Sequence, residues 1–300
     1  MGRLSGVLPV DKPSGPTSHD VVLAVRRATG VHRVGHAGTL DPLATGVLLL
    51  CLGSATRISE FLAGHDKVYS VEARLGVATD TYDAEGQVVA EHDGPMPADR
   101  QIEEAVRSLE GDILQTPPPY SAVKVRGRPL YEYARTGSAV RAEPREVSLY
   151  SIGWSRPSPY ALRLQVHCSA GTYVRSLVHD LGQRLGCGAH VTGLRRLRSG
   201  PFEVGDCLEL EEAMGRLRCR DRSVLVDIAA ALGDFPRLAL GEADLARLMH
   251  GQAVAASPPR EVGFHVVTDP EGTAVGIARW DAEKGLWRPR KVFPGEVAVE

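Results

Sequence analysis

Residues 35–50 read GHAGTLDPLATGVLLL and pass from a polar loop into an apolar run. The glycines permit positive φ angles and close backbone approach, which suit a loop that presses against a ligand. Pro42 restricts the preceding residue, Asp41, to an extended conformation, and the apolar run 47–52 is typical of a strand buried on both faces. A carboxylate on such a loop is either a catalytic group or part of an Asx turn that closes the entry to the strand.

The composition is that of an ordinary globular protein. The chain has 300 residues, 43% of them hydrophobic and 24% charged, with a net charge of −2. This length allows one large core, or a large domain with a small one. Long apolar runs and an apolar signal core are absent from the sequence, so we expect neither a membrane span nor secretion. The five cysteines form no CxxC pair, which predicts reduced thiols in a cytoplasmic protein.

The spacing of apolar residues predicts both strands and helices. Strand patterns occupy residues 6–11, 67–75, 86–91, 146–154 and 160–168. Helical patterns begin after a cap at Thr17 or Ser18 and recur at residues 56–62, 99–109, 130–135 and 173–185. We place a domain boundary near residues 220–237, before a strand-rich tail.

Charge is distributed unevenly along the chain. Residues 120–145 carry six basic side chains against two acidic ones, and residues 163–198 carry six arginines against one aspartate. Residues 202–250 are acidic, with ten acids against six arginines. Basic segments on a nearly neutral protein suit a polyanion that docks on one face, although basic loops are also often solvated surface.

Three further residues are candidates for a site with Asp41. Lys12 lies in the loop DKPSGPTS, and is either a solvated cap, a support for the Asp41 loop or a phosphate contact. Tyr69 lies near the start of a predicted strand, and is either a core residue with a wet hydroxyl or a ring that stacks on a base. Arg175 begins a predicted helix after the turn CSAGTY. It either pairs bidentately with a carboxylate or lies on the surface.

The sequence favours neither a metal site nor a nucleotide cofactor. His32 and His36 are four residues apart, but glycines near the second make a helical His pair improbable. The chain contains no Walker loop, Rossmann fingerprint or Ser-His-Asp pattern.

Five motifs, taken in order, resemble the TruB family of tRNA pseudouridine-55 synthases. They are DKPSGPTS, GHAGTLDPLATGVLLLCLGSATR, DKVYSVEARLG with TDTYDAEG, PPPYSAVKVRGRPLYEYARTG, and CSAGTYVRSLVHDLGQRLGCGAHVTGLRRLRSG. The resemblance covers roughly residues 4–230. It implies an α+β catalytic domain over residues 1–230, with a mixed, largely antiparallel sheet of the pseudouridine synthase type and flanking helices. By position, residues 236–300 would form a small, β-rich, PUA-like RNA-binding domain.

The resemblance also implies a reaction. An isomerase of this family detaches the base of uridine 55 in the tRNA T loop, rotates it and reattaches it through carbon 5. The rearrangement is redox-neutral and needs no metal or other cofactor. The resemblance further implies a cytoplasmic monomer that binds the T arm and T loop of tRNA.

Three catalytic residues follow from the resemblance. Asp41 matches the essential aspartate of the GTLDP motif, which either adds to the sugar or base or removes the 2′ proton of the sugar. Tyr69 matches the tyrosine that stacks on the uracil, near the proton that carbon 5 loses. Arg175 matches the arginine that pairs with the aspartate and orients it.

Substrate-binding residues follow in the same way. Tyr173 and Leu194 match residues that line the base pocket. His36 matches the histidine that contacts the substrate and fills the space left by the flipped nucleotide, and Lys12 matches a support of the loop. The basic segment at about 120–145 matches the segment that grips the T arm, through charges that include Lys124, Arg126 and Arg128.

Two other functions remain open. One is a synthase of the same fold that modifies another RNA, with a guide and partner proteins. The T-arm segment argues against it, because a guide-dependent relative would have less need of such a grip. The other is a tRNA-binding or RNA-folding protein whose catalysis is secondary.

Overall fold

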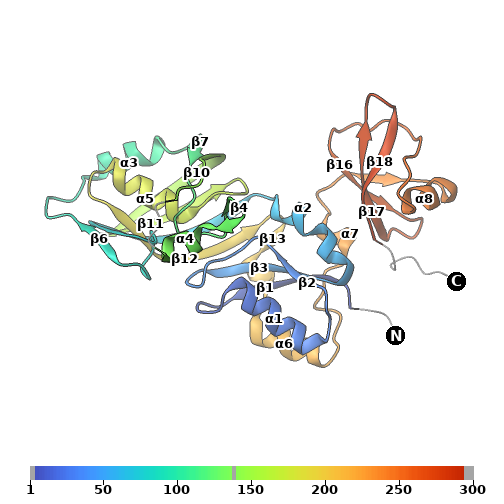
Figure 1. The fold of residues 1–300 in the computed structure, drawn as a ribbon, viewed down its shortest axis with the longest axis horizontal. Coiled ribbons are helices and arrows are strands. Elements are labelled where there is room, and N and C mark those ends of the chain that lie inside the picture. Colours follow the sequence, from blue (N-terminus) through green and yellow to red (C-terminus); the bar gives the residue numbers. More distant parts are fainter. Residues whose placement is uncertain (1–3, 137–139, 294–300) are drawn as a thin grey trace. The chain divides into compact units, whose positions relative to one another are not determined.

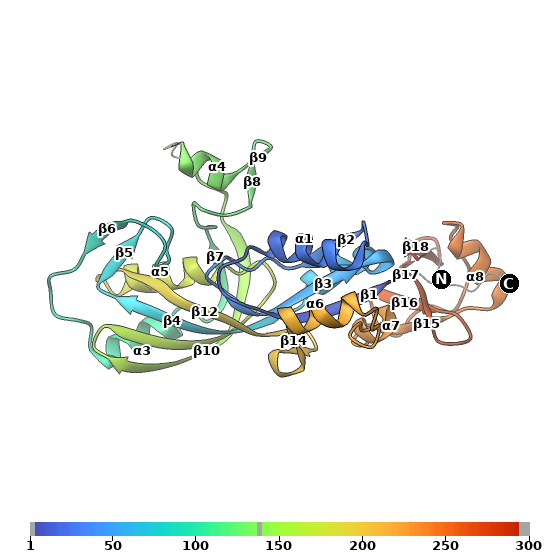
Figure 2. The ribbon, with the colours of Figure 1, turned by 90° about the horizontal axis from the view of Figure 1, so that it is seen from below.

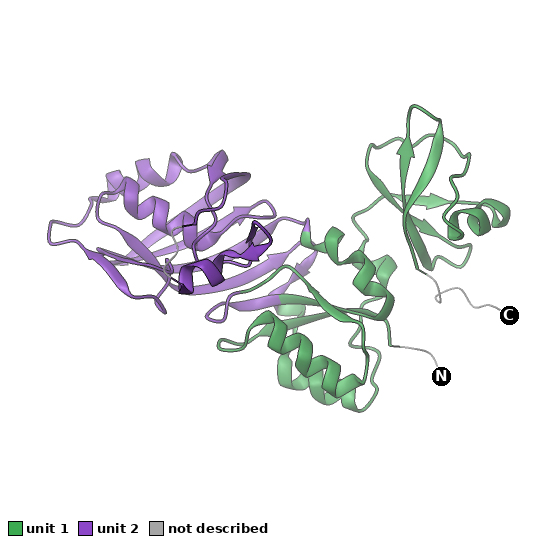
Figure 3. Cartoon of the chain, viewed as in Figure 1, with its two compact units in different colours: residues 1–40, 48–63, 205–300 green, residues 41–47, 64–204 purple. Residues whose placement is uncertain are grey.

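The computed structural model describes residues 4–136 and 140–293, and these divide into two compact units. The first unit contains residues 1–40, 48–63 and 205–300, and the second contains residues 41–47 and 64–204 (Figure 3). Strand β3 (Thr45–Leu52) begins in the second unit and ends in the first.

The second unit is built on five long or medium strands that pair with their neighbours in antiparallel fashion (Figure 1). Their order is β12 (Ala189–Ser199), β4 (Lys67–Leu75), β11 (Ala161–Cys168), β10 (Arg145–Ser158) and β7 (Gly111–Gln115). Along β4 every second residue is buried, as the alternating sequence pattern predicts. Residues Thr45 and Gly46 of β3 pair in parallel with β12.

Shorter elements complete the second unit. They are helices α3 (Asp99–Arg107), α4 (Leu130–Arg135) and α5 (Val174–Arg184), the hairpins β5 (Val77–Thr79) with β6 (Val88–Glu91) and β8 (Lys124–Val125) with β9 (Arg128–Pro129), and strand β13 (Phe202–Glu203). Apolar residues of α5 are buried on one face of the helix, as expected for an amphipathic helix on a sheet.

The part of the first unit outside the C-terminal sheet includes the buried remainder of β3. It contains strands β1 (Gly6–Lys12), β2 (Val34–Ala37) and β14 (Leu208–Glu209), 3₁₀-helices η1 (Gly53–Ile58) and η2 (Val204–Asp206), and helices α1 (Ser18–Thr29), α2 (Ser59–Ala63), α6 (Leu210–Arg218) and α7 (Ile228–Ala231). Residues 47–52 are all buried, which confirms the predicted core strand. Thr17 and Asp20 form a capping box at the start of α1.

A separate four-stranded sheet forms near the C-terminus. Its order is β15 (Arg237–Ala239), β16 (Phe264–Thr268), β17 (Ala274–Asp281) and β18 (Leu286–Val292), with helix α8 (Glu242–Met249) packed on it through Leu248. The apolar core of this part includes Val267, Val275 and the fully buried Trp287. The domain limits at residues 230 and 236 stay a prediction.

These elements confirm an α+β fold with a mixed, largely antiparallel sheet of ten strands. The helix expected at 56–62 is divided, because a 3₁₀ turn occupies Gly53–Ile58 and an α-helix follows at Ser59–Ala63. Among the described residues, every helix is too short or too polar to cross a membrane.

Candidate active site

The Asp41 loop is closed by its own backbone. The amide of Ala44 donates a hydrogen bond of 3.1 Å to the carbonyl of Asp41. Gly46, a little further on, has a φ of 99°, and a Cβ at this position would lie 2.2 Å from the carbonyl oxygen of Arg196. Since only glycine fits this approach, the loop can enter β3 directly against β12.

Arg175 forms a bidentate ion pair with Asp41. Its Nε lies 2.8 Å from Oδ2 of Asp41, and its Nη2 lies 3.0 Å from Oδ1. The Arg175 side chain is 6% exposed, whereas that of Asp41 is 32% exposed. Two parallel hydrogen bonds define both the position and the plane of the carboxylate, and part of the carboxylate stays open. The structure thus brings together the two residues that the resemblance pairs, and the surface alternative for Arg175 is wrong.

Asp83 is a second carboxylate on the same guanidinium. Nη1 of Arg175 donates to the carbonyl of Thr81 at 2.9 Å and to Oδ2 of Asp83 at 3.2 Å. Nη2 also donates to the carbonyl of Tyr120 at 2.9 Å. Asp83 is 3% exposed, and its Oδ1 accepts a hydrogen bond of 2.6 Å from the Thr81 hydroxyl. The arginine is therefore held from both sides, by a buried acid and by a partly exposed one.

Asp83 was not among the predicted site residues. It lies in the segment TDTYDAEG, which contributes to the family resemblance, and that resemblance was the only signal for it. Local spacing cannot reveal its contact with Arg175, because 92 residues separate the two in the chain.

Tyr69 lies on β4 and is 8% exposed. In the sheet its Cα partners are Val166 on β11 and Arg196 on β12. The guanidinium carbon of Arg196 lies 6.0 Å from the centre of the Tyr69 ring. Burial raises the pKa of the Tyr69 phenol, and the positive charge of Arg196 opposes that rise. The phenol therefore has a buried cation as its neighbour.

Tyr173 is the N-cap residue of α5, the helix that carries Arg175, and Leu194 lies with Arg196 on β12. The backbone of Tyr173 exchanges two hydrogen bonds with the Gln115 side chain, of 2.7 Å through its amide and 3.0 Å through its carbonyl. Leu194 is 8% exposed and pairs with Val71 across β12 and β4. Because Val71 is two residues from Tyr69, Leu194 shares the face of the sheet that carries the Tyr69 ring.

The second unit therefore contains all the predicted catalytic and base-pocket residues, namely Asp41, Tyr69, Tyr173, Arg175 and Leu194, and also the three predicted cations. His36 and Lys12 belong to the first unit. His36 lies on β2 opposite Leu50 of β3. Lys12 is completely buried, and its Nζ donates to the carbonyl of Pro13 at 2.8 Å. The solvated-cap alternative for Lys12 is thus wrong.

The three predicted RNA-binding cations lie on the β8–β9 hairpin. Figure 2 shows this hairpin and α4 projecting from the sheet of the second unit. Lys124, Arg126 and Arg128 are all exposed. Arg126 occupies the turn with a φ of 51°, and Arg128 lies 3.3 Å from Glu132 of α4. A projecting hairpin with exposed cations can contact a phosphate backbone.

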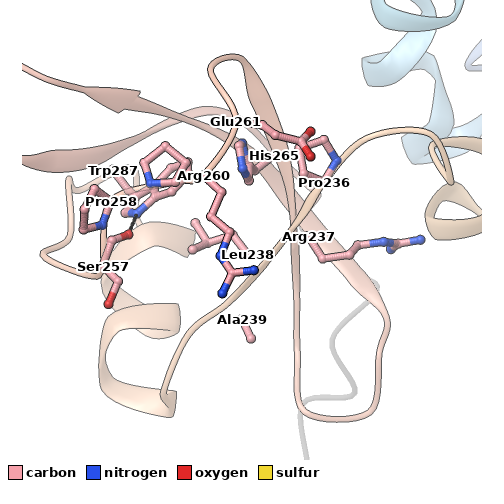
Figure 4. Close-up of a pocket in the computed structure, with 11 residues that line it drawn as sticks. Pro236, Arg237, Leu238, Ala239, Ser257, Pro258, Arg260, Glu261, His265 and Trp287 are labelled. Atoms are coloured by element: carbon pink, nitrogen blue, oxygen red, sulfur yellow. Dashed lines mark hydrogen bonds between the residues drawn. The ribbon is translucent and has the colours of Figure 1, made fainter.

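Neither a metal-ligand cluster nor a cavity adds a member to this site among the described residues. The described part of the chain contains no group of three or more His, Cys, Asp or Glu side chains arranged to hold a metal ion. A cavity of about 320 Å³ lies in the C-terminal sheet, and Figure 4 shows its lining, which includes Arg260, His265 and Trp287. The predicted site residues do not line this cavity.

Two family profiles match the sequence. That of the TruB family pseudouridylate synthase N-terminal domain covers residues 26–174, and that of the tRNA pseudouridylate synthase B C-terminal domain covers residues 175–226. Together they extend over more than half of the chain and include the residues of the candidate site in the second unit.

Individual proteins match over most of their length. The tRNA pseudouridine synthase B of Syntrophotalea carbinolica is 44% identical over 283 residues, or 92% of each chain. That of Symbiobacterium thermophilum is 48% identical over 257 residues, or 84% of each chain. Among solved structures, a chain of a Cbf5-Nop10-Gar1 complex matches with a TM-score of 0.74 and 26% identity, over 96% of this chain and 84% of that one.

Proposed function

The chain belongs to the TruB family of pseudouridine synthases, and from that premise we propose that it isomerises uridine 55 in the T loop of tRNA. Relatives named tRNA pseudouridine synthase B support the tRNA substrate. The observation that carries the proposal is the bidentate pair between Arg175 and the partly exposed Asp41 carboxylate. In this pair the buried Arg175 fixes the Asp41 carboxylate, which stays accessible to a ligand.

The reaction exchanges one bond of the nucleotide for another. The bond between nitrogen 1 and carbon 1′ breaks, the base rotates, and carbon 5 bonds to carbon 1′. Carbon 5 then loses its proton and nitrogen 1 gains one, so the number of atoms and the oxidation state are unchanged. The chemistry therefore needs a positioned carboxylate and a route for protons.

Asp41 is the proposed catalytic carboxylate. It either adds to the sugar or base or removes the 2′ proton, and both routes require an oxygen that reaches the flipped nucleotide. Arg175 orients the carboxylate, and Asp83 in turn holds Arg175. Because the carboxylate is already in position, the protein has less reorganisation to undergo when the transition state forms.

The base pocket is proposed to form on the face of β4 and β12. The Tyr69 ring stacks on the uracil and lies near carbon 5, while Tyr173 and Leu194 line the pocket. His36 contacts the substrate, and Lys12 supports the loop. Stacking offsets part of the unstacking energy of base flipping, which is a few kcal/mol.

We infer that the T arm is held by the basic segment at 120–145, through Lys124, Arg126 and Arg128. Residues 1–230 then form the catalytic domain, and residues 236–300 form a PUA-like RNA-binding domain built on strands β15–β18. The protein is proposed to act in the cytoplasm as a monomer.

A tritium-release experiment tests the proposal. An unmodified tRNA transcript labelled at carbon 5 of its uridines is incubated with the purified protein, and tritium released to water is counted. We expect one tritium per tRNA, no release with Asp41→Asn, and no release when the target uridine is replaced by cytidine. Release from Asp41→Asn would contradict the role of Asp41, and tight tRNA binding without any release would favour a binding protein.

A further inference from the structure

Strand pairing places a buried arginine beside the catalytic tyrosine. Arg196 and Tyr69 are direct Cα partners in the ladder between β12 and β4. Directly opposed residues point to the same face of a sheet. The guanidinium carbon lies 6.0 Å from the ring centre, a separation at which a cation still interacts with an aromatic ring.

The Arg196 side chain is hydrogen-bonded to β3, the strand that follows Asp41. Its Nε donates a hydrogen bond of 2.7 Å to the carbonyl of Val47, and its backbone pairs with Gly46. The residue is 1% exposed. Burial of a guanidinium costs free energy unless its donors are hydrogen-bonded. The bond to Val47 meets part of this need and holds the charge between β4, which carries Tyr69, and the start of β3, which follows the Asp41 loop.

Four ionisable groups face the Tyr69 phenol or lie on its face of the sheet. Arg196 comes from β12, Cys168 from β11, Asp41 from its loop, and Lys67 from two residues earlier on β4. Burial raises the pKa of the Cys168 thiol to about 11, which makes it neutral at pH 7. Burial lowers the pKa of Lys67 to about 8. Of these groups, Arg196 most strongly opposes the effect of burial on Tyr69.

We propose that Arg196 is a positioning residue that stabilises the anionic form of the Tyr69 phenol, so that the phenolate can take the proton that carbon 5 loses. The inference rests on the proposed isomerisation. The bond between carbon 5 and hydrogen breaks, its electron pair returns to the ring, and the phenolate oxygen becomes a phenol. Nitrogen 1 takes a proton from water, and the phenol later returns its proton to water. Because arginine stays charged in proteins, this stabilisation is present across the working pH range.

The first test titrates position 69 without RNA. A fluorinated tyrosine at this position ionises at lower pH than tyrosine, so its titration can be followed by ultraviolet difference spectroscopy while the protein is folded. We expect Arg196→Gln to raise the pKa at position 69 by about 1 to 2 pH units, as for loss of a close opposite charge. Arg195→Gln is the matched control, because Arg195 opposes Ser70 in the same ladder, and should leave this pKa unchanged. Equal pKa values in Arg196→Gln and its parent would overturn the proposal.

The second test measures the proton step. Single-turnover tritium release by Arg196→Gln should be about tenfold slower near pH 7 and should approach the wild-type rate as pH rises, because the rate follows the phenolate fraction. Fluorinated tyrosine at position 69 should restore release in Arg196→Gln. A slow variant without such rescue would mean that Arg196 acts only on structure.

Arg196→Lys covers the case in which the glutamine variant does not fold. It keeps a positive charge but not the planar fork, and we expect a smaller rise of the pKa at position 69 with the same rescue. A rise as large as the 1 to 2 pH units expected for loss of the charge would overturn the proposal, because Arg196→Lys retains that charge. Failure of the proposed isomerisation is seen separately, as absence of tritium release from the wild-type protein, whereas the RNA-free titration depends on no activity.

Discussion

Arg175 binds both oxygens of the Asp41 carboxylate, through Nε at 2.8 Å and Nη2 at 3.0 Å. The two residues are 134 positions apart in the chain, so the pair exists only when the loop before β3 and the start of α5 have come together. A planar fork matches a carboxylate in a way that a single ammonium cannot. The geometry of this pair, in addition to its charge, is therefore expected to matter for catalysis.

Arg175→Lys tests this expectation. The lysine keeps a positive charge but cannot bind both oxygens, so the carboxylate loses its defined plane. We expect kcat to fall by about 100-fold, since small misplacements of a catalytic group have effects of this size, with little change in the Kd for tRNA. Single-turnover tritium release and filter binding measure the two quantities. Arg184→Lys, at an exposed position of the same helix, is the control, and an unchanged kcat in Arg175→Lys would remove the pair from the mechanism.

Asp83→Ala should affect both stability and rate. The side chains of Asp83 and Arg175 are 5% and 6% exposed, and removal of one partner of a buried ion pair costs about 3–5 kcal/mol. The remaining pair with Asp41 offsets part of this loss, so we expect about 2–4 kcal/mol in urea unfolding and a lower kcat. Glu85→Gln changes an exposed acid of the same turn and should alter neither quantity. Wild-type stability in Asp83→Ala would show that the second carboxylate is dispensable.

Local sequence patterns predicted the elements better than their contacts. The apolar run 47–52 is uniformly buried, and Lys67–Leu75 alternates as expected, because burial on one or both faces of a strand leaves a direct trace in composition. Asp41, Tyr69 and Arg175 come from three different family motifs, and all three lie in the second unit.

The contacts of Asp83 and Arg196 could not be predicted in this way. LRRLRSG reads as a basic surface segment, yet the register between β12 and β4 turns Arg196 inward to 1% exposure. Its bond to Val47 spans 149 residues. Register shifts of one residue reverse the facing of every side chain in a strand, so such burial follows from pairing and not from local spacing.

Charge reversal on the β8–β9 hairpin should weaken tRNA binding. Replacement of Lys124, Arg126 and Arg128 by glutamate removes three exposed cations. If each contacts one phosphate, the slope of log binding constant against log salt concentration should become shallower by about 2 to 3. The rate at saturating tRNA should change little. Filter binding over a salt series measures the slope.

The control for the hairpin is a second triple reversal. Arg100, Arg107 and Arg163 are 88%, 75% and 65% exposed and lie outside the hairpin. Their replacement by glutamate changes the net charge by the same amount, so any general electrostatic effect will appear in both proteins. Equal salt slopes in the two triple variants would show that the hairpin makes no special contact with RNA.

Lys67 should make stability depend on pH in the alkaline range. Lys67 is 5% exposed, and burial, assisted by the charge of Arg196, lowers its pKa from 10.5 to about 8. Between these values the unfolded chain binds more protons than the folded protein, so the contribution of this residue to stability rises with pH. For a difference of this size the rise approaches ~3 kcal/mol.

Lys67→Met isolates that contribution. The methionine has no charge to desolvate, so the stability of the variant relative to wild type should be greatest below about pH 8 and should decline by up to ~3 kcal/mol as pH approaches 10.5. Urea unfolding at a series of pH values gives this difference, and a constant packing offset does not affect its slope. Lys284→Met, at an exposed position, should follow the wild-type pH dependence. Parallel curves for wild type and Lys67→Met would mean that Lys67 stays protonated in the folded protein, with its charge compensated inside the sheet.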